Sequence, residues 1–138
     1  MILADTSAWV EFDRATGSRV HRRVAELVLS PPEGSELAVT EPVVMEVLVG
    51  ARSEGRAEDL RRLLARSVLL PVEPASDFEA AAGMYRQCRR AGVTPRGLLD
   101  CLIAAVAWRH RASLLTTDVD LARVAGVVGI DLDDPSAG

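Results

Sequence analysis

The stretch Met1-Ile2-Leu3-Ala4-Asp5-Thr6-Ser7 joins a short apolar run to one carboxylate and two hydroxyl side chains. An apolar run closed by residues that favour helix starts predicts a buried strand that turns directly into a helix. In an open α/β sheet, ligands bind outside the carboxyl ends of the strands. We therefore expect Asp5 to lie at the edge of a sheet where a functional site can form.

The composition is that of a globular protein. The chain has 138 residues, of which 49% are hydrophobic and 26% charged, so we expect one domain over residues 1–132 and a flexible tail over 133–138. The first apolar run is too short for a signal peptide, and no apolar run approaches the roughly 20 residues of a membrane span. These features predict a cytoplasmic protein with no membrane partner. Cys88 and Cys101 lack the spacing of a redox or zinc motif and are predicted to be buried, reduced thiols.

The charged residues are unusual in kind. All sixteen cationic side chains are arginine, and the formal net charge is −4. A mildly acidic protein binds nucleic acid only where its arginines are gathered or where a metal offsets its carboxylates. Receiver domains and phosphatases also place aspartates at strand ends, but they normally bind the phosphoryl group with a lysine. The lack of lysine argues against both.

Hydrophobic periodicity predicts strands that alternate with helices. Strands are expected at 1–4, 37–40, 68–70 and 113–116, with a fifth candidate at 130–132. Helices are expected to start at Thr6 or Ser7, at Thr40 or Glu41, at Ser76, at Thr94-Pro95 and at Asp118. This alternation predicts an α/β fold in three layers, with a parallel sheet covered by helices on both faces.

Four carboxylates stand out from this pattern. Asp5 and Asp118 follow predicted strands, while Glu46 and Asp100 lie in helices that are otherwise strongly apolar. Each has an ordinary explanation as a turn residue, a helix cap, a dipole partner or a solvated helix margin. Together on the carboxyl side of one sheet they would repel each other and stay ionised only around cations. Carboxylates suit Mg²⁺ or Mn²⁺, and magnesium held by carboxylates and water is typical of phosphate chemistry.

Four segments carry a resemblance to a known family. They are Asp5-Thr6-Ser7, Glu46-Val47-Leu48-Val49-Gly50, Asp100-Cys101-Leu102-Ile103-Ala104-Ala105 and Thr117-Asp118-Val119-Asp120. In this order they resemble the motifs of PIN-domain ribonucleases, and within that superfamily the VapC-type toxins of bacterial toxin–antitoxin pairs. The resemblance spans nearly the whole chain, and residues 89–96 also resemble the family's lead-in to its third acid.

Two positions depart from the family pattern. Family members often carry a serine or asparagine shortly before the third acid, where this chain has Gly97-Leu98-Leu99. The last motif commonly ends in an aromatic residue, and Leu121 stands in its place. The first departure puts polar support for Asp100 in doubt, and the second is a packing change.

The resemblance implies a PIN-like twisted parallel sheet and an endoribonuclease that depends on Mg²⁺, with Mn²⁺ as a substitute. Asp5, Asp100 and Asp118 would hold metal, and Glu46 would complete the acidic pocket. A metal-activated water would then attack a phosphodiester bond. The family also implies a homodimer and a cognate VapB-like antitoxin that covers the acidic groove.

Further residues are candidates for supporting roles. Thr6, Ser7 and Thr117 could donate hydrogen bonds to the acids, with Asp120 as an accessory acid. The substrate needs positive charge, which Arg89, Arg90 and Arg96 beside the Asp100 helix could supply to RNA phosphates. A solvated helix end explains these arginines equally well.

Two alternatives to the ribonuclease reading stay open. One is a catalytically silent PIN-like interaction module, which the presence of all four acids argues against. The other is a DNA- or flap-type metal nuclease, whose members are usually larger and carry extra acids. A comparison of matched RNA and DNA strands would separate the two nuclease classes.

Overall fold

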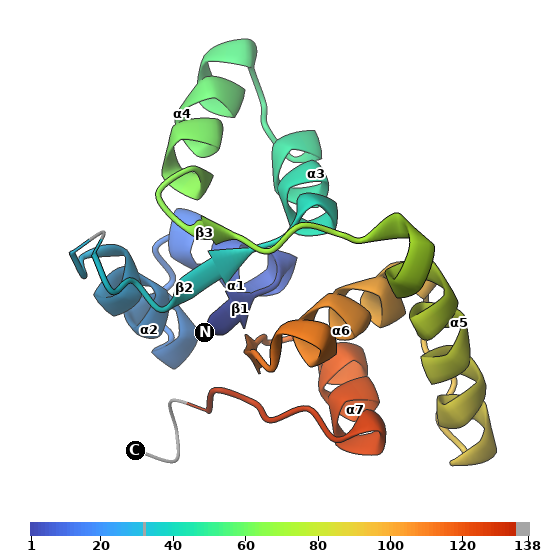
Figure 1. Cartoon of the computed structure of the whole chain (residues 1–138). Coiled ribbons are helices and arrows are strands. Elements are labelled where there is room, and N and C mark those ends of the chain that lie inside the picture. Colours follow the sequence, from blue (N-terminus) through green and yellow to red (C-terminus); the bar gives the residue numbers. More distant parts are fainter. Residues whose placement is uncertain (32, 135–138) are drawn as a thin grey trace.

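The computed structural model describes residues 1–31 and 33–134. Within these residues, one four-stranded sheet has the order β3-β2-β1-β4, and every neighbouring pair is parallel. The strands are β1 (Ile2–Ala4), β2 (Leu37–Val39), β3 (Val68–Leu69) and β4 (Ser113–Leu115). The predicted parallel sheet flanked by helices is confirmed (Figure 1).

Seven helices accompany the sheet in the described part of the chain. They are α1 (Thr6–Asp13), α2 (Arg19–Val28), α3 (Glu41–Val49), α4 (Glu54–Leu64), α5 (Pro74–Arg90), α6 (Leu98–His110) and α7 (Val119–Val128). Helix α1 packs against α2, and α5, α6 and α7 pack against one another. Figure 1 shows α5, α6 and α7 grouped together at the lower right, apart from α1 and α2.

The order of the strands creates a switch point beside β1. From β1 the chain steps to β2 and then β3 on one side, whereas β4 lies on the other side of β1. Ligands of open α/β sheets bind at the carboxyl ends of the strands where the order reverses in this way. The fold therefore places its favoured binding edge between the ends of β1 and β4.

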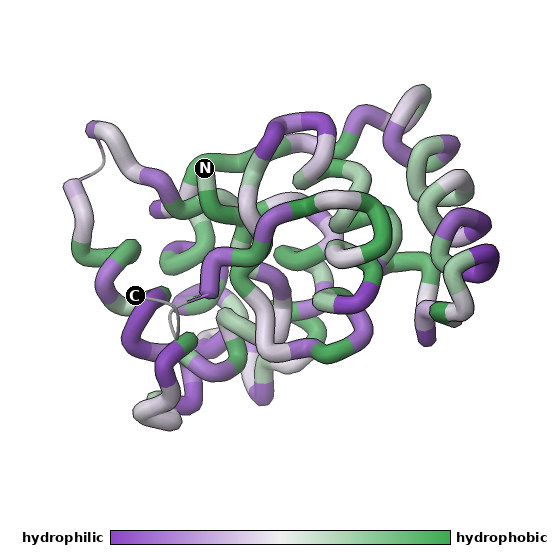
Figure 2. Tube along the Cα trace, turned by 90° about the horizontal axis from the view of Figure 1, so that it is seen from below, coloured by the Kyte–Doolittle hydropathy of each residue, from purple (hydrophilic) through white to green (hydrophobic). Residues whose placement is uncertain are grey.

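The core is built around β1, β4 and α6. Leu3, Leu114 and Leu115 are completely buried, and every residue of α6 from 101 to 107 is also buried. A helix that is apolar on all sides is expected to lie inside the protein. Figure 2 shows hydrophobic segments running through the centre of the molecule, with hydrophilic stretches at its outer turns. Cys88 and Cys101 are buried free thiols, as predicted.

Two predicted helix starts are wrong. Helix α6 begins at Leu98 after an extended Gly97, and not at Thr94-Pro95. Helix α5 begins at Pro74, where proline fits the first turn, and Asp77 accepts a hydrogen bond from the Glu73 N–H. The predicted Ser76 cap is therefore inside the helix. In both cases, residues of a type that favours helix starts lie two to four positions from the observed start.

The predicted fifth strand is reduced to one bridge. Leu132 pairs with Leu114 at a single position, after Gly129 ends α7 in a left-handed conformation. The expected tail begins with an anchored residue, because the Asp133 N–H donates to the Leu114 carbonyl over 2.8 Å and its carboxylate accepts from Arg23. The rest of that tail, residues 135–138, lies outside the described residues. Among the described helices, none has the length and apolar character needed to cross a membrane.

Candidate active site

Five carboxylates form what we call the acidic cluster: Asp5, Glu46, Asp100, Asp118 and Asp120. Asp5 directly follows β1, and Asp118 lies three residues beyond the end of β4. The register pairs Ala4 with Leu115, and the Asp5 N–H donates to the Leu115 carbonyl over 3.1 Å. Both acids therefore lie at the switch point of the sheet. The negative charges of the other four members all act on Asp100.

Asp5 is buried and held by three donors. Its carboxylate accepts hydrogen bonds from the Ser7 hydroxyl at 2.7 Å, the Thr116 hydroxyl at 2.6 Å and the Ala8 N–H at 3.0 Å. The bond from Ala8 makes Asp5 the N-cap of α1. Burial raises the pKa of Asp5, and the charge of Asp118 adds to this, although the three hydrogen bonds oppose the shift. Asp5 is thus precisely oriented but costly to ionise.

Asp118 is the N-cap of helix α7. Its carboxylate accepts from the Asp120 N–H at 2.8 Å, and its own N–H donates to the Thr116 hydroxyl at 2.9 Å. Thr116 therefore bonds to both Asp5 and Asp118. One hydroxyl thus contacts the Asp5 carboxylate and the backbone N–H of Asp118, the two acids that follow the neighbouring strands β1 and β4.

Asp100 lies half-buried in the first turn of α6 with little polar support. In the described part of the chain no donor is recorded for its carboxylate. Burial raises its pKa to about 6, with further contributions from the charges of Asp118, Asp5, Glu46 and Asp120. The missing support matches Gly97-Leu98-Leu99, which replaces the polar residue expected before the third acid.

Glu46 comes from α3 on the other side of the cluster. It is exposed, and it accepts a hydrogen bond from the Thr6 hydroxyl over 2.7 Å. Its charge contributes to the raised pKa of Asp100. Four separate segments of the chain thus bring their carboxylates to one edge of the sheet.

Comparison with known proteins identifies this arrangement. The PIN domain family matches residues 2–127 of the chain. The chain belongs to the PIN domain family. It is 45% identical over 130 residues to VapC ribonuclease Mb1587 of Mycobacterium bovis and to Ribonuclease VapC11 of Mycobacterium tuberculosis, covering 94% of this chain and 96% of each relative. The predicted membership among VapC-type PIN proteins is confirmed.

Solved structures share the fold at low sequence identity. DNA-bound VapBC from Salmonella typhimurium aligns with a TM-score of 0.75 at 19% identity, over 97% of both chains. FitAcB from Neisseria gonorrhoeae aligns with a TM-score of 0.70 at 23% identity, over 99% of both chains. The PIN-like α/β fold predicted from the sequence is therefore confirmed.

The hydroxyl residues predicted to support the PIN-domain acids take different positions. Thr6 bonds to Glu46 and Ser7 bonds to Asp5. Thr117 donates only its backbone N–H, to the Ser7 hydroxyl at 2.8 Å, and no hydrogen bond of its own hydroxyl is recorded among the described residues. Thr116, which the sequence analysis did not single out, bonds to Asp5 instead. Its role follows from the pairing of β1 with β4, which no local pattern reveals.

The predicted RNA-binding arginines divide into two groups. Arg96 forms ion pairs with Asp118, at 3.3 Å, and with Asp120. Arg89 and Arg90 are exposed at the end of α5, and the described residues provide no ion pair for either. Arg96 therefore acts as a counter-ion to the acidic cluster in this structure.

The donor chemistry of the cluster suits a divalent cation, because hard carboxylate oxygens gather there and Asp100 has no cationic partner in the described part of the chain. The arrangement itself is not a finished metal cage. Over residues 1–31 and 33–134, no group of three His, Cys, Asp or Glu side chains is placed to hold a metal ion. Asp5 accepts from Ser7 and Ala8 at one oxygen and from Thr116 at the other, which leaves the second oxygen able to accept a further partner. The assignment of metal to Asp5, Asp100 and Asp118 stays a prediction.

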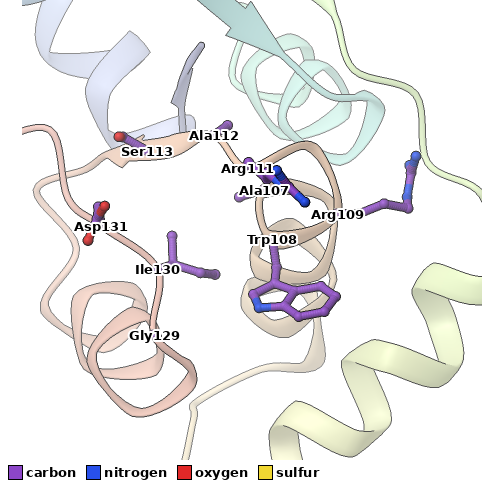
Figure 3. Close-up of a pocket in the computed structure, with 9 residues that line it drawn as sticks. All are labelled: Ala107, Trp108, Arg109, Arg111, Ala112, Ser113, Gly129, Ile130 and Asp131. Atoms are coloured by element: carbon purple, nitrogen blue, oxygen red, sulfur yellow. The ribbon is translucent and has the colours of Figure 1, made fainter.

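A cavity lies at the C-terminal end of α6, away from Asp100. This cavity of ≈ 480 Å³ is bordered by Trp108, Arg111, Ser113 and Asp131, and no member of the acidic cluster lines it. Figure 3 shows these side chains around the amino end of β4, where the α6 and α7 helices finish. Trp108 is 57% exposed there, so it is not a core residue. The acidic cluster lies at the opposite edge of the sheet, beyond the carboxyl ends of β1 and β4.

Proposed function

We propose that this PIN-domain protein is a Mg²⁺-dependent endoribonuclease, with Mn²⁺ as a substitute, and that it acts in the cytoplasm as the toxin of a toxin–antitoxin pair. The observation that carries the proposal is the convergence of acids from four segments on Asp100, whose pKa is raised to about 6. Its relatives at 45% identity are named ribonucleases, which supports RNA as the substrate.

The residues divide the work as follows. Asp5, Asp100 and Asp118 would hold Mg²⁺, which when bound supplies an activated water and neutralises charge on the scissile phosphate. Ser7 and Thr116 fix the direction of the Asp5 carboxylate through their 2.7 Å and 2.6 Å hydrogen bonds. This support restricts the rotation of a ligand that must otherwise be ordered on binding.

Glu46 is the acid best placed to handle a proton. It is exposed and held by Thr6 at 2.7 Å, so its second oxygen stays available to a water or substrate hydroxyl. Asp100 contributes differently, because its raised pKa makes its ionisation costlier than that of an exposed carboxylate, and a cation bound beside it would offset that cost.

The proposed partners are a VapB-like antitoxin and a second copy of the chain. Structural relatives include a toxin–antitoxin complex from Klebsiella pneumoniae and VapBC from Rickettsia felis, which supports an antitoxin here. Arg96 already places a guanidinium against Asp118 and Asp120. An antitoxin arginine or lysine could bind the same carboxylates in its place.

The test is cleavage of total cellular RNA by the purified protein, freed of any antitoxin. Reactions would contain Mg²⁺, Mn²⁺ or a chelator, and Asp100→Asn would be run beside the wild type. Asp59→Asn is the matched control, because Asp59 is an exposed acid of α4 outside the acidic cluster. We expect discrete products that require metal and Asp100 and that persist in Asp59→Asn.

Three results would contradict the proposal. Cleavage that survives Asp100→Asn would place the active site elsewhere or indicate contamination. The absence of cleavage with either metal would favour the silent interaction module. Preferential cleavage of a matched DNA strand would favour the DNA-type nuclease.

A further inference from the structure

A groove of ≈ 560 Å³ opens beside the acidic cluster between α1, α3 and α4. Its lining includes Glu46, Trp9, Gly50, Arg14, Arg52 and Leu60. Glu46 is the one residue that this lining shares with the acidic cluster. We call this hollow the arginine groove.

The rim of the arginine groove carries uncompensated positive charge. Arg56 also lines it but is paired with Asp13. Arg14 and Arg52 are both exposed, and within residues 1–31 and 33–134 neither side chain has a recorded hydrogen bond or ion pair. Arg14 interacts with Glu11 only through space. Two guanidinium groups are thus free to bind an anion.

The wall of the groove is apolar and its floor is open. Trp9 and Leu60 are 1% and 5% exposed and form a packed surface. Gly50 follows α3 with φ −77° and ψ −4°, which any residue can adopt, and an added Cβ would come no closer than 3.5 Å to the Val47 carbonyl oxygen. The glycine therefore leaves space rather than permitting an unusual backbone.

We propose that the arginine groove holds the RNA strand on one side of the scissile bond, with Arg14 and Arg52 binding backbone phosphates. This inference rests on the proposed ribonuclease function. A phosphodiester at the acids must continue into neighbouring nucleotides, and the groove that shares Glu46 with the acids receives them. Exposed cations along the rim suit the phosphate backbone of a single strand.

The same charges would also attract an acidic protein segment, but continuity with the acids favours RNA. The reacting phosphodiester must lie at the acidic cluster, so the neighbouring phosphates of the same strand come within reach of the adjoining groove. Arg96 is less suited to this role because Asp118 and Asp120 already neutralise it. The assignment moves phosphate binding from the Arg89–Arg96 segment to the opposite side of the site.

The test is RNA binding by Arg14→Gln/Arg52→Gln, measured by fluorescence anisotropy with a labelled short single-stranded RNA. A chelator would prevent cleavage, and the salt concentration would be varied. The matched control is Arg66→Gln/Arg111→Gln, because both arginines are exposed, lack recorded ion pairs in the described residues and line other hollows. Two lost phosphate contacts should reduce the slope of log K against log salt by about 1.4. The control should keep the wild-type slope.

A second variant tests the groove without changing charge. Gly50→Leu should weaken RNA binding by filling the groove, should leave the salt slope unchanged and should retain the wild-type thermal midpoint. Wild-type affinity in both Arg14→Gln/Arg52→Gln and Gly50→Leu would overturn the inference, as would an equal loss in the control pair.

The outcomes separate this inference from the ribonuclease proposal. If wild type and Arg14→Gln/Arg52→Gln cleave and bind RNA equally, the groove is wrong and the ribonuclease stands. If the wild type neither cleaves nor binds RNA, both are wrong. If a poly-glutamate peptide binds in an Arg14- and Arg52-dependent manner while RNA binding does not depend on them, the groove serves an acidic protein segment instead.

Discussion

The carboxylates at the two ends of α6 have pKa values shifted in opposite directions. Near its C-terminal end, Arg109 donates two hydrogen bonds of 2.9 Å to Asp77 and a third of 2.7 Å to the Pro71 carbonyl. Burial raises the pKa of Asp77, but the bonds from Arg109 and the Glu73 N–H outweigh it and leave that pKa lowered. At the N-terminal end, burial and neighbouring acids raise the pKa of Asp100 to about 6.

This difference shows what an acid contributes in each place. Asp77 is 1% exposed and joins the start of α5 to the end of α6, which is a structural role. Asp100 has no arginine of its own among the described residues, although sixteen cationic residues were available to the chain. An acid left without a counter-ion weakens the fold and keeps a place for a cation.

The largest effect is expected at the neutralised end. Arg109→Ala should lower the free energy of unfolding by about 3 kcal/mol, because it leaves the buried Asp77 without its partner. Urea unfolding at neutral pH measures this change. Arg111 lies two residues further on and has no recorded ion pair within residues 1–31 and 33–134, so Arg111→Ala is the control and should change stability much less. Equal effects of the two variants would remove the contrast between the helix ends.

An intermediate effect is expected from the hydroxyl that joins two acids. Thr116→Val should destabilise the protein by about 2 kcal/mol, because it removes a 2.6 Å hydrogen bond to the buried Asp5 carboxylate. It should also reduce RNA cleavage roughly 10- to 100-fold, as expected for a residue that orients a metal ligand. The matched substitution Thr117→Val removes a hydroxyl that has no recorded bond among the described residues, and it should be nearly silent in both measurements. A larger effect at Thr117 would reverse the two assignments.

The smallest effect has the opposite sign. Because the pKa of Asp100 is raised to about 6 from 3.8, its ionisation costs stability in the folded protein. That cost is absent below about pH 4, grows as the pH rises and is complete above about pH 6. Asp100→Asn should therefore be more stable than the wild type by about 1 kcal/mol at pH 7.5, after allowance for solvent screening, and equally stable at pH 3.5.

Denaturant unfolding in a chelator at both pH values measures the Asp100 effect. A stability difference that does not change with pH would mean that the raised pKa is not its cause. Asp59→Asn should show no pH-dependent gain, since Asp59 is an exposed acid.

The sequence predicted the helices and strands better than the contacts between them. Apolar runs at 1–4 and 113–116 identified β1 and β4, because burial of a strand depends on local composition. Thr116 escaped notice because its partner Asp5 is set by the register Ala4–Leu115, which depends on residues more than one hundred positions apart. The same limit applies to the arginine groove, whose Arg14 and Arg52 come from separate helix ends.

Local signals also misplaced some boundaries. Thr94-Pro95 has the composition of a helix start, but the chain stays extended through Gly97 before α6 begins. The four acids were predicted because Asp5 and Asp118 follow apolar strands, while Glu46 and Asp100 lie in strongly apolar helices. Arg96 was predicted to bind RNA phosphates, and its pairing with Asp118 and Asp120 in the structure depends on how the segment before α6 folds back on α7.

Because Asp5 and Asp118 act as helix N-caps, the backbone amides of Ala8 and Asp120 can report on cation binding at these acids. Asp5 and Asp118 accept the N–H groups of Ala8 and Asp120 with the same carboxylates that are proposed to bind a cation. A cation that draws on these oxygens must alter the protection of the two amides against hydrogen exchange with solvent. The first turns of α1 and α7 would then record occupancy of the site in the absence of any RNA or chemical label.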